Sequence, residues 1–167
     1  ECNIDPQSTG TPDDFDGQTA RSLVDYVMAV GRIDCSIPLN LLARLLRAAS
    51  STPNFSIIHL LDLLQGLDIF RLREVGTEGA DIQIGPRLNL EAELICRARF
   101  SGQDSRIPTK LLQDVIRESL PIGLNEKSER AFLLDLLSKL DKDNLGQVGI
   151  KRHESRDAFL GFAEALK

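Results

Sequence analysis

The N-terminal half of the chain predicts three successive helices, because apolar residues recur there every three or four positions. These positions are, in order, Leu23, Val27 and Val30; Leu39, Leu42, Leu45 and Leu46; and Ile57, Ile58, Leu60, Leu61, Leu63 and Leu64. Ser36 is a candidate N-cap of the second helix, with Pro38 in its first turn, and Asn54 is a candidate N-cap of the third. The third helix is apolar on more than one face, so we expect it to be buried on several sides.

Two strand-like runs follow the third helix. Residues 67–75 alternate imperfectly and residues 80–84 alternate cleanly, with Gly76-Thr77-Glu78-Gly79 between them. Helix, helix, helix, strand, turn, strand is the order of a winged helix-turn-helix. We therefore predict a mostly α fold, with a flexible lead-in at 1–17, a winged-helix domain with a small two-stranded wing at 18–101, and a helical segment at 105–167.

Helical periodicity resumes after the wing. Residues 88–100 place Leu90, Leu94 and Ala98 at intervals of four. Three further apolar stripes follow: Ile107, Leu111, Leu112, Val115 and Ile116; Phe132, Leu133, Leu136, Leu137 and Leu140; and Phe159, Phe162, Ala163 and Leu166. Pro121 and Gly123 are expected to end the first of these later helices.

The length and composition of the chain restrict the number of domains and the cellular location that we expect. A chain of 167 residues suits one compact domain or two small ones. Its cysteines, Cys2, Cys35 and Cys96, are odd in number and widely spaced, so we expect free thiols and a cytoplasmic location. No apolar run approaches the ~20 residues that span a bilayer. Because the chain begins at Glu1 rather than Met, it is expected to be a piece of a longer protein or to have been processed.

The charge pattern disfavours DNA reading. In a DNA-reading winged helix the third helix offers Arg, Lys, Asn or Gln to base edges, yet this helix has no Lys or Arg. The whole chain carries a net charge of -5, and residues 67–100 hold five Arg against six acids. Affinity for phosphates comes from clustered cations, so we do not expect DNA as a partner.

Three arginines remain candidate contacts for a phosphate or a neighbouring domain. Arg71 and Arg73 lie near the wing and are placed to touch phosphate, or else form a solvated edge with Glu74 and Glu78. Arg87 precedes a helix start, where its cation would face a phosphate or an acidic neighbouring domain. The alternative is that Arg87 bonds to backbone carbonyls or to Glu91.

No motif predicts catalysis, a metal or a cofactor. Residues 141–152 resemble an EF-hand loop, but Leu145 stands at the fifth ligand position and Arg152 where a bidentate Glu should be. His59 lies in an apolar helix, and His153 opens the last helix. No Gly-Lys dipeptide occurs, so the chain lacks a Walker A loop and is not expected to hydrolyse nucleotides.

The chain resembles the winged-helix part of bacterial STAND-type P-loop NTPases. The resemblance is carried by Ile58-His59-Leu60-Leu61, by Leu67-Asp68-Ile69-Phe70-Arg71 and by Pro86-Arg87-Leu88-Asn89-Leu90-Glu91-Ala92-Glu93-Leu94. Glu129-Arg130-Ala131-Phe132-Leu133-Leu134-Asp135-Leu136-Leu137 and Phe162-Ala163-Glu164-Ala165-Leu166 are similar to the helical region that follows it.

The resemblance implies a non-enzymatic regulatory module. In that family the winged helix packs on the nucleotide domain, favours a closed resting state and moves when a sensor domain detects a ligand. Some members act in defence against phages. The expected partner is therefore an adjacent NTPase or sensor domain of a larger chain, with Arg87 as the contact carried over. The competing hypothesis is a transcription regulator whose winged helix binds DNA and whose C-terminal helices form a dimer.

Overall fold

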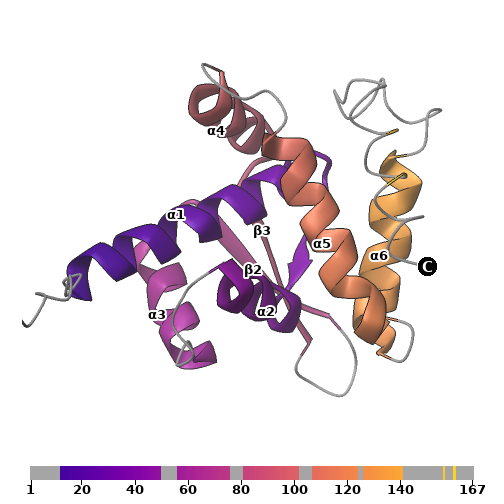
Figure 1. Ribbon diagram of the computed structural model, residues 1–167, viewed down its shortest axis with the longest axis horizontal. Helices are drawn as coiled ribbons and strands as arrows, with labels where there is room; N and C mark the ends of the chain where they lie inside the picture. Colours follow the sequence, from indigo (N-terminus) through magenta and orange to yellow (C-terminus); the bar gives the residue numbers. More distant parts are fainter. Residues whose placement is uncertain are drawn as a thin grey trace, which may run out of the picture.

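The computed structural model describes residues 12–49, 56–75, 81–101, 107–123 and 126–140, together with 156 and 160. Within them the protein is mostly helical, with a small antiparallel sheet (Figure 1). The elements are α1 (Pro12–Gly31), β1 (Ile37–Pro38), α2 (Leu39–Ala49), α3 (Ile57–Gly66), β2 (Phe70–Val75), β3 (Asp81–Pro86), α4 (Asn89–Phe100), α5 (Ile107–Gly123) and α6 (Lys127–Leu140).

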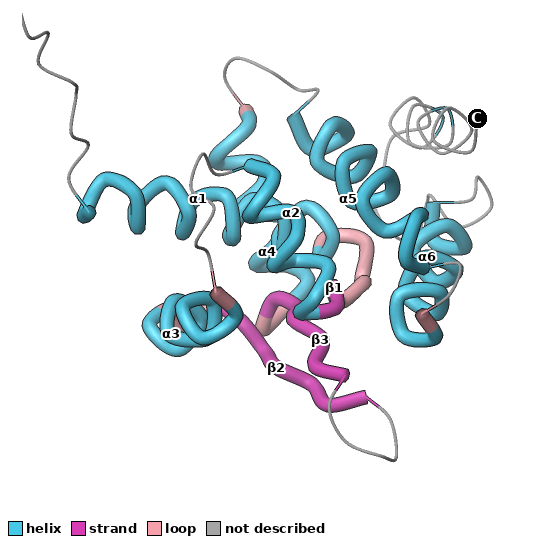
Figure 2. Tube along the Cα trace, turned by 60° about the horizontal axis from the view of Figure 1, so that its bottom comes forward, coloured by secondary structure: helices cyan, strands magenta, loops and turns pink. Residues whose placement is uncertain are grey.

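The sheet has three strands rather than the two expected from the sequence. Their order is β1-β3-β2, with Ile37 opposite Ile84 and Pro38 opposite Gln83 (Figure 2). Pro38 therefore belongs to a strand, and the prediction that it lies in the first turn of a helix is wrong. Proline is tolerated here because β1 is an edge strand, where a missing N–H need not break a ladder.

Two helix starts also differ from the predictions. Helix α1 begins at Pro12 instead of near residue 18, and proline suits a first helical position because its missing N–H would have no partner there. Helix α3 is capped by Ser56, whose hydroxyl accepts a hydrogen bond from the backbone N–H of His59 at 3.2 Å. The predicted cap, Asn54, lies outside the described residues.

The end of α1 is closed by an aspartate in a left-handed conformation. Asp34 has φ 60, and its backbone N–H donates to the Gly31 carbonyl at 3.0 Å. The next N–H, of Cys35, donates to Val30 at 3.4 Å. These two bonds form a Schellman motif, in which glycine is the usual residue at the left-handed position. An aspartate there directs a carboxylate to the place where α1 meets β1.

One continuous core joins the later helices to the earlier elements. Helices α1 and α2 pack against β3, while α5 packs against α1, α2 and α6. The same cluster of buried side chains contains Leu23, Leu42 and Ile84 along with Ile116 and Leu136. The predicted stripe of α6 is confirmed, since Phe132, Leu133, Leu136 and Leu140 are all buried. The division into domains at 18–101 and 105–167 stays a prediction.

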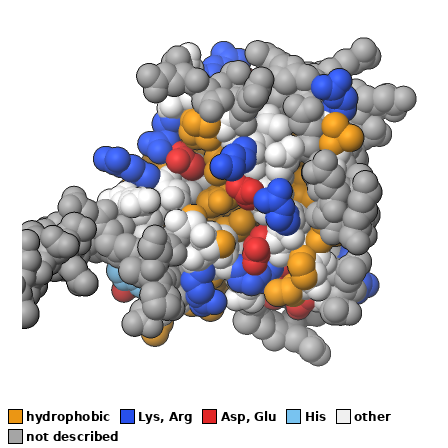
Figure 3. Space-filling view, viewed as in Figure 1, with side chains coloured by type: hydrophobic (Ala, Val, Ile, Leu, Met, Phe, Trp, Pro, Cys, Tyr) orange, Lys and Arg blue, Asp and Glu red, His pale blue; other side chains and the backbone are white. Residues whose placement is uncertain are grey.

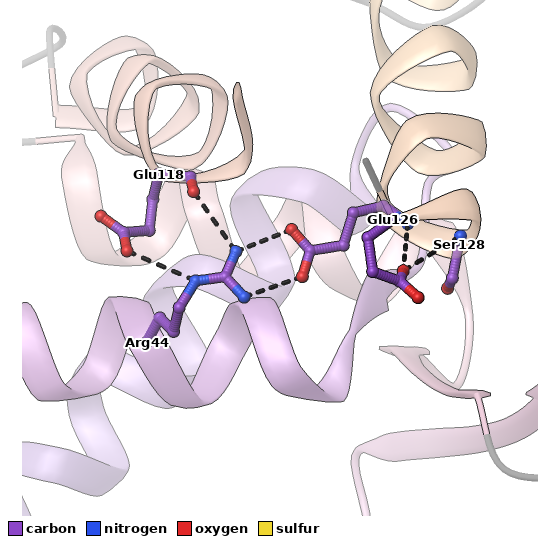
Figure 4. Close-up of polar contacts among 5 residues, drawn as sticks. Arg44, Glu118, Glu126 and Ser128 are labelled. Atoms are coloured by element: carbon purple, nitrogen blue, oxygen red, sulfur yellow. Dashed lines mark hydrogen bonds and ion pairs between the residues drawn. The ribbon is translucent and has the colours of Figure 1, made fainter. Parts of the chain in front are cut away.

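A buried ion pair fastens α6 to α2. The guanidinium of Arg44 on α2 donates to both carboxylate oxygens of Glu129 on α6, at 2.8 and 2.7 Å. Its Nε lies 3.4 Å from Glu118 on α5, and its Nη2 donates to the Glu118 carbonyl at 3.3 Å (Figure 4). The hydrogen bonds that Arg44 donates to Glu129 raise the pKa of Arg44 above its ordinary value. Glu129 is only 3% exposed, so its carboxylate is shielded from water. The pair therefore holds α6 against the rest of the fold.

The same helix is capped by a neighbouring carboxylate. Glu126 accepts hydrogen bonds from the backbone N–H groups of Ser128 at 3.2 Å and Glu129 at 3.4 Å (Figure 4). A negative charge at a helix N-terminus satisfies donors that have no partner within the helix. The cap holds Glu129 in the first turn of α6, facing Arg44.

None of the helices that the structure describes is long and apolar enough to cross a membrane.

Candidate functional site

Helix α3 buries one face and exposes another. Leu60 and Leu64 are buried, whereas the side chains of Ile57 and Ile58 are 39% and 73% exposed. The prediction that α3 is buried on several sides is therefore wrong. The helix packs on α2 through its buried leucines, and among the described residues no element covers Ile58. The outward side of α3 therefore presents the two isoleucines together with the exposed Asp62 and Gln65, and it carries no Lys or Arg.

The three arginines singled out in the sequence line one pocket. The cationic pocket has a volume of about 590 Å³ and is lined by Asp34, Ser36, Arg71, Arg73, Gln83, Gly85, Pro86, Arg87, Leu88, Asn89, Ala131, Phe132, Asp135 and Lys139. The sequence predicted Arg71, Arg73 and Arg87 as contacts, but not that α6 would face them. Among the described lining residues are four cations and two carboxylates, and one of the cations, Arg87, is paired with two carboxylates outside the lining, Glu91 and Asp68.

The sheet forms one wall of the cationic pocket. Arg71 lies opposite Gly85 in the ladder and Arg73 lies opposite Gln83. These four residues share one face of the β2–β3 pair, because successive side chains on a strand point to opposite faces. Gly85 lets Ser36 pack closely against this wall, since a Cβ built on Gly85 would lie 2.7 Å from the Ser36 hydroxyl.

Arg87 is held by two carboxylates. Its Nη2 lies 2.9 Å from Glu91 and its Nη1 lies 3.4 Å from Asp68. The hydrogen bond that Arg87 donates to Glu91 raises the pKa of Arg87 above its ordinary value. The Arg87 carbonyl in turn accepts a hydrogen bond from Arg71 at 2.9 Å. The alternative weighed from the sequence, a bond from Arg87 to a nearby carboxylate, is therefore present, although its side chain remains 51% exposed.

The opposite wall comes from α6 and from the turn after α1. Lys139 donates to the Asp34 carbonyl and lies 3.2 Å from Asp135, while Asn89 donates to the Asp34 carboxylate at 2.6 Å. The Cys35 thiol lies 3.4 Å from Asp135, and burial raises the pKa of this thiol well above its usual range. Sequence reasoning missed this wall because Asp135 and Lys139, four residues apart, have the spacing of an ordinary surface pair on a helix.

Helix α4 turns two leucines outward, while its larger Phe100 and its Ile95 are partly buried. Leu90 is 65% exposed and Leu94 is 54% exposed, whereas Ala92 and Cys96 are buried. The predicted helix is present, but the Leu90–Leu94 stripe does not face the core. Small residues suit the buried face because α4 packs closely on α1, beside Met28.

The remaining surface gives no broad basic patch on the face drawn in Figure 3. Lys and Arg side chains are interleaved there with Asp, Glu and apolar side chains. Arg99 pairs with Asp25 at 3.0 Å and Arg117 pairs with Asp114 at 3.1 Å. Pairing of this kind lowers the positive potential that a polyanion would meet.

Several sequence candidates lie outside the described residues, namely the EF-hand-like loop at 141–152, His153 and Cys2. Where the structure is described, no group of three or more His, Cys, Asp or Glu residues is arranged to hold a metal ion. Neither Cys35 nor Cys96 forms a disulfide with another described residue, and both are buried. Comparison with protein-family models, curated proteins and solved structures finds no match to this chain.

Proposed function

We propose that this chain is a non-enzymatic regulatory module of winged-helix type, which binds an adjacent NTPase or sensor domain of a larger signalling protein. Support comes from the order α1, β1, α2, α3, β2, β3, in which β2 and β3 occupy the place of the wing. Such a module acts as a two-state element whose docking a ligand elsewhere can bias. The similarity to STAND-type NTPases suggests a cytoplasmic setting and a role in defence against phages.

The surface of α3 carries this proposal. In a DNA reader the equivalent helix brings polar and cationic side chains to base edges. Here the outward face offers Ile57 and Ile58 beside Asp62 and Gln65, so Gln65 is its one exposed amide and it has no cation. Burying one isoleucine side chain on a partner contributes roughly 1.5–3 kcal/mol. The physical preference of this surface is thus for an apolar protein partner.

Arg87 supplies a second contact in the proposed module. Its ion pairs to Glu91 and Asp68 involve a side chain that is 51% exposed, and exposed pairs contribute at most about 1 kcal/mol. Arg87 can therefore exchange one of its carboxylate partners for an acidic group on a docked NTPase domain at little cost.

A pair of substitutions tests the docking role in the longer protein that the proposal requires. Ile58→Asp should weaken docking of the module and change the ATP turnover rate, because it places a charge in the apolar interface. Leu134→Asp on α6 is the matched control, since Leu134 is 62% exposed and lies on a different element. Equal turnover in both variants, or flanking sequence without a P-loop, would contradict the proposal.

The alternative of a DNA-binding regulator rests on a different observation. Arg71 and Arg73 lie on β2, in the position of a wing, and both are exposed. Wing cations of this kind can touch the phosphate backbone without reading sequence. Binding of duplex DNA that is lost when both arginines are replaced would favour this alternative.

A further inference from the structure

The cationic pocket is chemically unlike the apolar surface of α3. Of the fourteen described residues that line it, nine are polar or charged, four of them cations and two of them carboxylates. A pocket of about 590 Å³ falls within the size range of small-molecule sites. Its chemistry therefore suits a small, polar, anionic ligand rather than an apolar helix or side chain.

Two arginines on the sheet wall have unused hydrogen-bonding capacity. Arg73 makes no hydrogen bond or ion pair with any other residue that the structure describes. Arg71 donates to a backbone carbonyl at 2.9 Å and pairs with no described carboxylate. The two residues are next-but-one neighbours on β2, so their backbone positions lie about 7 Å apart on one face. That spacing leaves room for one tetrahedral phosphate group between two guanidinium groups, each of which matches oxyanion geometry.

The opposite wall suits hydroxyl groups. Asp135 offers a carboxylate and Asn89 an amide, while Gln83 and Ser36 add an amide and a hydroxyl on the sheet side. Lys139 is already engaged by Asp34 and Asp135, so it balances these carboxylates and prevents them from repelling an anion. The lining therefore combines an oxyanion-binding side with a hydrogen-bonding side.

The geometry points to a binding site for a phosphate monoester of a small hydroxyl-bearing molecule, of the sugar phosphate or nucleoside monophosphate class. The phosphate lies between Arg71 and Arg73, and the hydroxyl groups face Asp135 and Asn89. Such a ligand would contact both the sheet and α6, and so would stabilise their packing. This site is separate from α3; it shares Arg87 with the proposed docking contacts, whereas Arg71 and Arg73, which hold the phosphate, take no part in that docking.

Titration calorimetry with ribose 5-phosphate tests this inference, with ribose and inorganic phosphate as companion probes. We expect ribose 5-phosphate to bind more tightly than either companion. Arg71→Ala combined with Arg73→Ala should weaken binding by about tenfold to a hundredfold, the effect of losing charge-assisted hydrogen bonds. Both side chains are exposed, so the double variant should fold. Arg97→Ala, which removes an exposed arginine outside the pocket, is the matched control.

Each other outcome overturns the assignment. Absence of measurable heat with ribose 5-phosphate at millimolar concentration would show that the pocket is not such a site. Equal weakening by the control variant would show general charge attraction. Equal affinity for inorganic phosphate and ribose 5-phosphate would show that the hydroxyl-facing wall takes no part. None of these results bears on whether α3 docks a protein.

Discussion

Removing the buried carboxylate of Glu129 should unfasten α6 from the rest of the protein. Glu129→Ala leaves the Arg44 guanidinium, which is 19% exposed, with only the weaker contacts to Glu118 at 3.3 and 3.4 Å. Breaking a buried pair from one side costs about 3–5 kcal/mol, because the remaining charge stays desolvated. We take the lower end, about 3 kcal/mol, since Glu118 still offers partial compensation. For a chain of this size the midpoint of thermal unfolding should fall by roughly 6–12 °C.

Urea unfolding followed by circular dichroism measures this loss of unfolding free energy. Two companion variants test whether the loss comes from the buried ion pair. Glu93→Ala removes the exposed pair with Arg97 and should cost less than about 1 kcal/mol. Replacing both partners, Arg44→Met with Glu129→Leu, should cost less than Glu129→Ala alone, because no unpaired charge is left buried. The reasoning is refuted if Glu129→Ala destabilises the protein no more than Glu93→Ala does.

Two further predictions concern α1. Gly31→Ala should destabilise the protein by about 1–3 kcal/mol, because the added Cβ would lie 2.4 Å from the ring of Pro86. Gly17→Ala on the same helix meets nothing within 4 Å and should stabilise the protein by about 0.5–1 kcal/mol. The urea midpoints of the two variants should therefore shift in opposite directions. Burial, with Asp114, Glu118 and Asp25 nearby, raises the pKa of Tyr26 from 10.0 to about 12, so the neutral phenol is favoured in the folded state. The resulting stability is complete below pH 10 and is lost as the pH rises to about 12. Phenolate absorbance reports this residue alone, because the chain has one tyrosine, and an unshifted titration in the folded protein would contradict the prediction.

Periodicity predicted the helices that face a large apolar core. The stripe Phe132, Leu133, Leu136 and Leu140 is confirmed because one side of α6 meets the main cluster of buried side chains. The same reasoning oriented α4 wrongly, since Ala92 and Cys96 are buried while Leu90 and Leu94 are exposed. A period of four residues does not reveal which face a neighbouring helix will approach closely, and a close approach favours small side chains.

Other features depend on contacts between distant residues. Strand β1 is only two residues long and contains Pro38, so no alternation could reveal it. The three arginines were recognisable as cations near the wing, but the α6 wall with Asp135 and Lys139 required the packing of α6 beside the sheet. The pair between Arg44 and Glu129 spans 85 residues of sequence, and neither residue has a local signal that distinguishes it from a surface charge.

The central claim is that α3 presents a protein-binding surface rather than a DNA-reading one. Fluorescence anisotropy of labelled duplex DNA at low salt, followed by a salt titration, tests it most directly. No anisotropy change is expected, because α3 has no cation and the chain carries a net charge of -5. Tight binding with a steep dependence on salt, abolished by Arg71→Ala with Arg73→Ala but unaffected by Arg97→Ala, would contradict it.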